Sequence, residues 1–124
     1  MTTIKSYTDI EQSRKLAEIL PIESADMSWV SNGLGKPFAR TIPIKGDPEE
    51  LCGCWSLAAL RNLLPTGIKI NENTYLFGSH NTFDKCWVYR YYNEDDTSYL
   101  YCKNINEVDV CVEIIEKLHK LNLL

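Results

Sequence analysis

The spacing of apolar residues predicts three helices, and the first begins at Thr8 and ends before Pro21. Thr8 can cap the first free amides, and Glu11, three residues later, can complete a capping box. The apolar residues on one face of this helix are Ile10, Leu16, Ala17 and Leu20. A second helix is expected over residues 55–64, where leucines line one side before Pro65.

The last helix is expected to follow Asn106, a residue type that commonly caps helices. Glu107 and Asp109 then lie in the first turn, where the helix dipole favours negative charge. Its wide apolar face contains Val108, Cys111, Ile114, Ile115, Leu118 and Leu121. This pattern is typical of an amphipathic helix that covers a sheet.

Strands are predicted where the apolar period changes from helical to two. Residues 86–92 and 98–103 are rich in aromatic and β-branched side chains, and the polar residues 93–97 join them as a hairpin loop. Residues 69–70 and 74–77 give weaker strand signals.

The stretch 22–48 is the least regular part of the chain. Residues 38–44 can hold a short strand, 32–35 are expected to form a mobile loop, and 47–51 to form a short helical turn. Helices and strands do not alternate along the chain, so a parallel sheet is disfavoured. We therefore expect a single α+β domain over residues 1–124, with a small antiparallel sheet packed against about three helices.

The net charge, the apolar runs and the cysteine content of the chain indicate which binding partners and which compartment to expect. The 124 residues carry a net charge of −4, so nucleic acid is disfavoured and no general attraction to anionic lipid is expected. The chain has no apolar run of the roughly 18 residues that a membrane helix needs. The first eleven residues lack an apolar signal core, and five cysteines fit a reducing compartment, so we expect a cytoplasmic protein with free thiols.

The segment Cys52-Gly53-Cys54 is the first candidate for chemistry. Thiols just before a helix can acquire a lowered pKa, and a cysteine enzyme would pair Cys54 or Cys52 with a base such as His80, oriented by Asp84. The alternative is that both cysteines are small buried residues that pack under the second helix. That alternative is favoured, because the chain has no nucleophile signature of a known kind.

A metal site is the second candidate, and its potential ligands are Cys52, Cys54, His80, Cys86 and Cys102. The spacing argues against zinc, since the chain has one Cys-x-Cys rather than the Cys-x2-Cys or Cys-x4-Cys of zinc knuckles. We expect no metal and no cofactor.

The aromatic hairpin is the third candidate. If residues 93–97 form the loop, Tyr91 opposes Tyr99 and Tyr89 opposes Tyr101 on one face of the sheet. The whole aromatic face would be Trp87, Tyr89, Tyr91, Tyr99 and Tyr101. Such a face suits a protein partner or a homodimer. The alternative is that the face is the core or is covered by residues 22–48, and as a structural expectation that alternative is favoured. A shift of one residue in the register would mix the two faces.

Four segments together resemble a family of small uncharacterised proteins from phages and mobile elements of gut anaerobic bacteria. They are residues 8–16 (TDIEQSRKL), 25–27 (ADM), 54–60 with 64–65 (CWSLAAL and LP), and 110–119 (VCVEIIEKLH). The resemblance covers about half of the chain. It implies a bacterial or phage setting, but no activity, cofactor or site residue.

The favoured hypothesis is thus a non-enzymatic binding or accessory protein that uses the aromatic hairpin face, with itself or another protein as partner. A cysteine-dependent enzyme is the alternative, and a structural metal-binding module is the second alternative.

Overall fold

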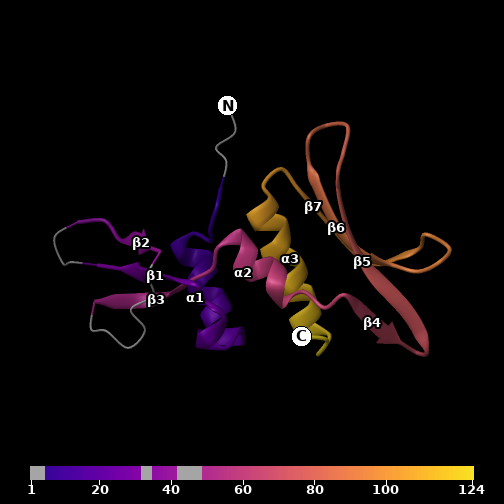
Figure 1. Cartoon of the computed structure of the whole chain (residues 1–124), viewed down its shortest axis with the longest axis horizontal. Helices are drawn as coiled ribbons and strands as arrows, with labels where there is room; N and C mark the ends of the chain where they lie inside the picture. The colour runs from indigo at the N-terminus through magenta and orange to yellow at the C-terminus, as the bar shows by residue number, and fades with distance from the viewer. Residues whose placement is uncertain (1–4, 32–34, 42–48) are drawn as a thin grey trace. The chain divides into compact units, whose positions relative to one another are not determined.

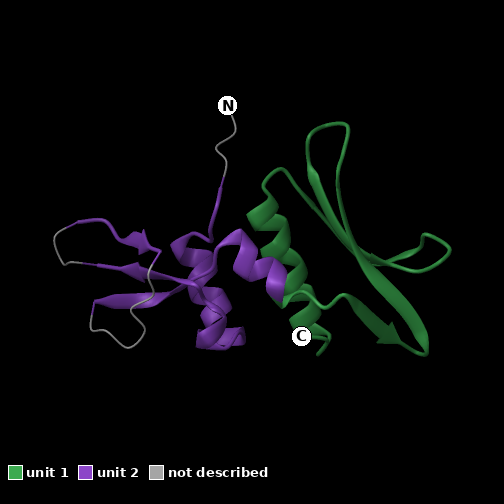
Figure 2. Ribbon diagram, in the orientation of Figure 1, with its two compact units in different colours: residues 1–4, 63–124 green, residues 5–62 purple. Residues whose placement is uncertain are grey.

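The computed structural model describes residues 5–31, 35–41 and 49–124, and the chain divides into two compact units. One unit spans residues 5–62 and the other consists of residues 63–124 together with 1–4 (Figure 2). Each unit contains an antiparallel sheet, and the chain order of the elements is labelled in Figure 1. The α+β prediction is confirmed, with two sheets in place of the one expected. That the chain behaves as a single domain stays a prediction.

The unit 5–62 is built on a three-stranded sheet of order β2-β1-β3, with α1 packed against β3. Its elements are α1 (Ile10–Ile19), the 3-10 turn η1 (Ile22–Ser24), β1 (Met27–Val30), β2 (Phe38–Arg40), β3 (Glu50–Cys54) and α2 (Leu57–Leu63), whose last residue belongs to the other unit. The buried apolar residues of the unit include Leu16, Val30, Trp55 and Leu60.

The start of α1 differs by one residue from the prediction. Asp9, not Thr8, is the N-cap, and it forms a capping box with Gln12. Asp9 Oδ1 accepts from the Gln12 N–H at 2.8 Å, and Gln12 Oε1 accepts from the Asp9 N–H at 3.1 Å. Thr8 therefore does not cap the helix, and its side chain is fully buried.

The prediction of a helical turn around residues 47–51 was wrong at its described end, where β3 begins at Glu50. Gly53 is a residue of this strand and lies beside Ala25. A Cβ at Gly53 would lie 2.9 Å from the Ala25 Cβ, so the close approach of the two segments requires glycine. The strand expected at 38–44 is present as Phe38–Arg40, whereas residues 42–48 and the loop residues 32–34 lie outside the described part of the chain.

The unit 63–124 is a four-stranded antiparallel sheet of order β4-β5-β6-β7, with α3 packed against β6 and β7. Its elements are β4 (Gly67–Ile70), β5 (Asn73–Asn81), β6 (Trp87–Tyr92), β7 (Ser98–Asn104) and α3 (Glu107–Lys120). Every strand expected in this half is confirmed, and β5 extends four residues further than its signal indicated. Long aromatic and β-branched runs carry a strong period-two pattern, which explains this success.

Helix α3 confirms the predicted N-cap position at Asn106, although the Asn106 side chain makes no capping hydrogen bond. Five of the six residues of the expected apolar face are fully buried, namely Val108, Cys111, Ile114, Ile115 and Leu118. Leu121 lies past the helix end and is 43% exposed, so that part of the prediction was wrong.

Candidate protein-binding surface

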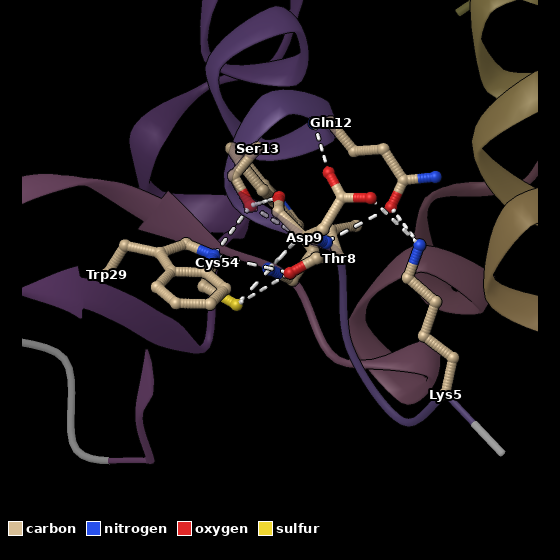
Figure 3. Close-up of polar contacts among 8 residues, drawn as sticks. Lys5, Thr8, Asp9, Gln12, Ser13, Trp29 and Cys54 are labelled. Atoms are coloured by element: carbon tan, nitrogen blue, oxygen red, sulfur yellow. Dashed lines mark hydrogen bonds and ion pairs between the residues drawn. The ribbon is translucent and has the colours of Figure 1, made fainter. Parts of the chain in front are cut away.

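Cys54 ends strand β3 and lies inside a network of buried polar groups in the unit 5–62 (Figure 3). Its Sγ lies 3.8 Å from the Thr8 hydroxyl and 3.5 Å from the Thr8 carbonyl oxygen. The Thr8 hydroxyl also lies 2.7 Å from the Ser13 hydroxyl and accepts from the Trp55 backbone N–H at 3.2 Å. These bonds join the chain before α1, helix α1 itself and the end of β3.

Trp29 of strand β1 completes this network from the other side. Its indole Nε1–H is shared between the Thr8 carbonyl oxygen at 3.2 Å and the Ser13 Oγ at 3.1 Å (Figure 3). Each buried hydroxyl therefore has a partner, as polar groups removed from water require. The cluster has the properties of a structural core rather than of a site open to substrate.

The electrostatics of the two cysteines agree with that interpretation. Burial raises the pKa of Cys54 to about 11, and burial also raises the pKa of Cys52 above its usual value. Both thiols are therefore protonated at neutral pH, whereas a cysteine nucleophile needs the thiolate. All five cysteines of the chain are free thiols.

The remaining members of the proposed cysteine and metal sites belong to the unit 63–124. His80 is an exposed residue of β5, and Asp84 lies in the turn after that strand. The Asp84 carboxylate accepts hydrogen bonds from the Thr82 hydroxyl and from Lys103, which lower its pKa. Within residues 5–31, 35–41 and 49–124, no three His, Cys, Asp or Glu side chains are placed to hold a metal ion.

The aromatic hairpin pairs differently from the prediction because β7 contains a bulge. Tyr92 pairs with Ser98 as expected, but Tyr91 then pairs with Leu100 and leaves Tyr99 as the extra residue. Beyond this point every pair is displaced by one residue, so that Tyr89 opposes Cys102. The predicted grouping of five aromatic residues on one face was therefore wrong.

The five residues separate into three environments. Tyr89 and Tyr91 are fully buried, and the Phe77 ring contacts both of them at centroid distances of 5.2 and 5.5 Å. Trp87 is half-buried. Tyr99 and Tyr101 remain exposed, at 40% and 49% of their surface. Of the predicted aromatic face, only Tyr99 and Tyr101 are exposed enough to contact a partner. Tyr89 and Tyr91 are core residues.

The sheet face opposite Tyr89 and Tyr91 carries a different set of side chains. Strand alternation places Arg90 and Tyr92 of β6 there, and the Arg90 guanidinium lies 4.4 Å from the centre of the Tyr92 ring. The Tyr92 ring in turn covers Gly78, where a Cβ would lie 2.7 Å from the Tyr92 Cε1. Leu76 and Tyr101 flank this stack in β5 and β7, and both are about half exposed.

The turn between β5 and β6 presents the most exposed apolar side chain among the described residues. Phe83 is fully exposed at the tip of this hairpin. The turn around it is closed by hydrogen bonds from the Thr82 N–H to the Cys86 carbonyl at 2.8 Å and from the Lys85 N–H to the Thr82 carbonyl at 3.0 Å. Lys85 has a φ of 63°, as expected for the last residue of a three-residue hairpin loop.

An ion pair fixes the same turn to the neighbouring strand. Lys103 Nζ of β7 lies 3.1 Å from Asp84 Oδ2. Phe83 was not among the sequence-based candidates, although a large apolar residue inside a polar turn was a signal that could have identified it. We call Phe83 and its turn, residues 82–86, the hairpin surface.

Comparisons with known proteins add nothing to the geometry. No family model matches the chain, and no curated protein or solved structure is significantly similar to it. None of the helices in the described part of the chain is long and apolar enough to cross a membrane.

Proposed function

We propose that this chain is a non-enzymatic protein-binding module that recognises its partner through the hairpin surface. The observation that carries the proposal is the full exposure of Phe83 at the tip of a hydrogen-bonded turn. The resemblance noted in the sequence supports a bacterial or phage setting, and we propose that the module is an accessory protein of a phage or mobile element that acts in the cytoplasm.

An aromatic ring held in water favours association, because burying a phenylalanine side chain contributes about 1.5–3 kcal/mol. Aromatic anchors of this kind are common among the few residues that dominate interface energies. The turn that holds Phe83 is already ordered by its own hydrogen bonds and by the Lys103–Asp84 ion pair, so binding would order little more of the chain.

Charge elsewhere on the same sheet favours a protein over a nucleic acid as the partner. The loop after β6 carries Glu94, Asp95 and Asp96, which are all exposed and would repel phosphates. Arg90, which pairs with Tyr101 between β6 and β7, is already bound to Asp96 at 2.6 Å.

A cysteine-dependent enzyme has less support. The most buried candidate, Cys54, donates into the network around Thr8 and holds its proton at neutral pH. Its proposed base, His80, is an exposed residue of β5.

The proposal is tested with the variant Phe83→Ser and a matched control. Phe38→Ser makes the same change at another exposed phenylalanine, in β2 of the other unit. The native protein and both variants are immobilised. The affinity of each of the three for every protein that binds to it is then measured, and further copies of the chain are among the proteins tested. Thermal unfolding of both variants verifies that they are folded.

We expect Phe83→Ser to weaken binding by about 30-fold or more, the size typical of an interface anchor, and Phe38→Ser to leave it unchanged. Equal affinity of native protein and Phe83→Ser for every partner would contradict the proposal.

A further inference from the structure

Strand β5 is much longer than the strand that pairs with its outer edge. β5 spans Asn73–Asn81, but β4 pairs only with residues 73–76. One further bond follows, from the Phe77 N–H to the Thr66 carbonyl oxygen at 3.1 Å. Residues 78–81 pair with β6 on one side and have no strand on the other within the described part of the chain.

The direction of the backbone groups along this open edge follows from strand geometry. In an antiparallel ladder the N–H and C=O of successive residues point alternately to the two sides. Because the Phe77 N–H points toward β4 and the Thr82 N–H points toward β6, Ser79 and Asn81 must direct their backbone groups away from β6. The open edge therefore presents two donors and two acceptors spaced as an extended polypeptide requires.

A second copy of the same strand fits these groups when it runs antiparallel. In the register that places Ser79 opposite Asn81 of the second copy, both outward-facing residues of each strand are paired, which gives four hydrogen bonds. A register that places Ser79 opposite Ser79 would require Phe77, whose N–H is already bound to Thr66. The register that places Ser79 opposite Asn81 therefore uses all four outward backbone groups of these residues and none that is already bound.

The open edge of β5 is also long enough for the same strand of a second copy, up to its hairpin turn. In this register the hairpin turn of the second copy, at residues 82–83, reaches the point where Thr66 and β4 close the edge. Phe83 of each copy would then be covered by the start of β4 in the other. The residues paired across the axis are Ser79, His80 and Asn81, so no pair of acidic or lysine side chains is opposed.

We propose that two copies of this chain associate through the β5 edges at residues 78–81, which joins their four-stranded sheets into one antiparallel sheet. This inference rests on the proposed function, and it names a second copy of the chain as the partner of the Phe83 hairpin. The two-fold axis passes between the two His80 residues.

Proline substitution tests the backbone bonds. Ser79→Pro removes an N–H that faces the open edge and spares the ladder with β6, whereas Ser79→Ala keeps the N–H and removes only the hydroxyl. Sedimentation velocity over a concentration series measures the dimer dissociation constant of each. We expect a dimer for the native chain and for Ser79→Ala, and a dissociation constant at least about tenfold higher for Ser79→Pro. Asn81→Pro is the second variant in case Ser79→Pro fails to fold.

A disulfide tests the register. Residues at a non-hydrogen-bonded antiparallel pair have Cα atoms about 4.5 Å apart, within the range of disulfides. His80→Cys should therefore form an intermolecular disulfide under mild oxidation. Thr74→Cys, an exposed position of β5 beside β4, should crosslink no more than the native chain with its own cysteines.

A native chain that stays monomeric at all concentrations would overturn the inference, as would equal crosslinking of the two cysteine variants. Either result leaves the proposed function standing if Phe83→Ser still abolishes binding of another protein. If the native chain dimerises and Ser79→Pro leaves that dimer unchanged, the inference fails. The proposed function fails with it only if Phe83→Ser weakens the binding of no protein, the second copy included.

Discussion

The interiors of the two units bury hydroxyl groups on different kinds of side chain. In the unit 5–62 the Thr8 and Ser13 hydroxyls are fully buried and bind each other at the centre of the fold. In the unit 63–124 Tyr89 and Tyr91 are also fully buried, and their hydroxyls donate at the ends of large rings to the Glu107 carboxylate and the Pro65 carbonyl. One interior depends on the fit of small hydrogen-bonding groups, and the other depends on aromatic area.

This difference indicates which substitutions should destabilise each interior most. An aromatic core loses most from removed volume, because the cavity left behind is large. A small polar network loses most from a single missing hydroxyl, because its partners stay buried and unsatisfied. Substitutions that remove either side-chain volume or a hydroxyl, but not both, should therefore destabilise the two units to different extents.

The largest effect is expected for Tyr91→Ala. Removal of this fully buried ring, which contacts Phe77, should lower the free energy of unfolding by about 3–5 kcal/mol. Tyr91→Phe keeps the ring and loses only the 2.7 Å bond to the Pro65 carbonyl, so it should cost about 1 kcal/mol. Denaturant unfolding measures both. Tyr99→Ala, at the exposed bulge, is the control, and an equal loss there would refute the assignment of Tyr91 to the core.

The register of this hairpin also shows where sequence reasoning reaches its limit. The strands β6 and β7 were predictable from their alternation, and the pair Tyr92–Ser98 from the loop length. The bulge at Tyr99 was not, because an extra residue leaves no compositional mark and yet exchanges the faces of everything beyond it. That is why Tyr101 was expected on the same face as Tyr89 and lies on the opposite face instead.

Helix starts and turns show the same limit at smaller scale. Thr8 and Asp9 are both good capping residues with suitable partners three positions later, so the sequence alone could not choose between them. The choice follows from tertiary structure, since the Thr8 hydroxyl is needed by Trp55 and Ser13. Phe83 was overlooked because one apolar residue in a turn carries no periodicity.

The next largest effect is expected for Thr8→Val in the polar interior. Valine has the shape of threonine, but the Ser13 hydroxyl and the Trp55 N–H would lose a partner at 2.7 and 3.2 Å. We expect a loss of about 1–3 kcal/mol in the free energy of unfolding. Thr8→Ser keeps the hydroxyl and should lose less. A Thr8→Val protein as stable as the native one would show that the network contributes nothing to stability.

A smaller effect, of about 1 kcal/mol, is expected for Gly78→Ala on the outer side of the aromatic sheet. The new methyl group would displace the Tyr92 ring, which lies under Arg90. Gly35→Ala is the control, because nothing lies within 4 Å of the added Cβ there. The double variant with Tyr92→Ala should show no further loss from Gly78→Ala. A further loss would mean that Tyr92 is not the cause.

The ionisation of Cys54 is expected to have the smallest effect on the free energy of unfolding at neutral pH. At that pH the thiol is protonated in both the folded and the unfolded chain. Its folded pKa of about 11 lies above the usual value of 9.0, so the stability linked to the protonated thiol is present below pH 9.0 and is lost as the pH rises through about 11. The difference in unfolding free energy between the native chain and Cys54→Ala, measured from pH 8 to 11 in steps of about one unit, should therefore shrink at the alkaline end. A constant difference would mean that Cys54 titrates alike in both states and is not held in the polar interior that distinguishes its unit.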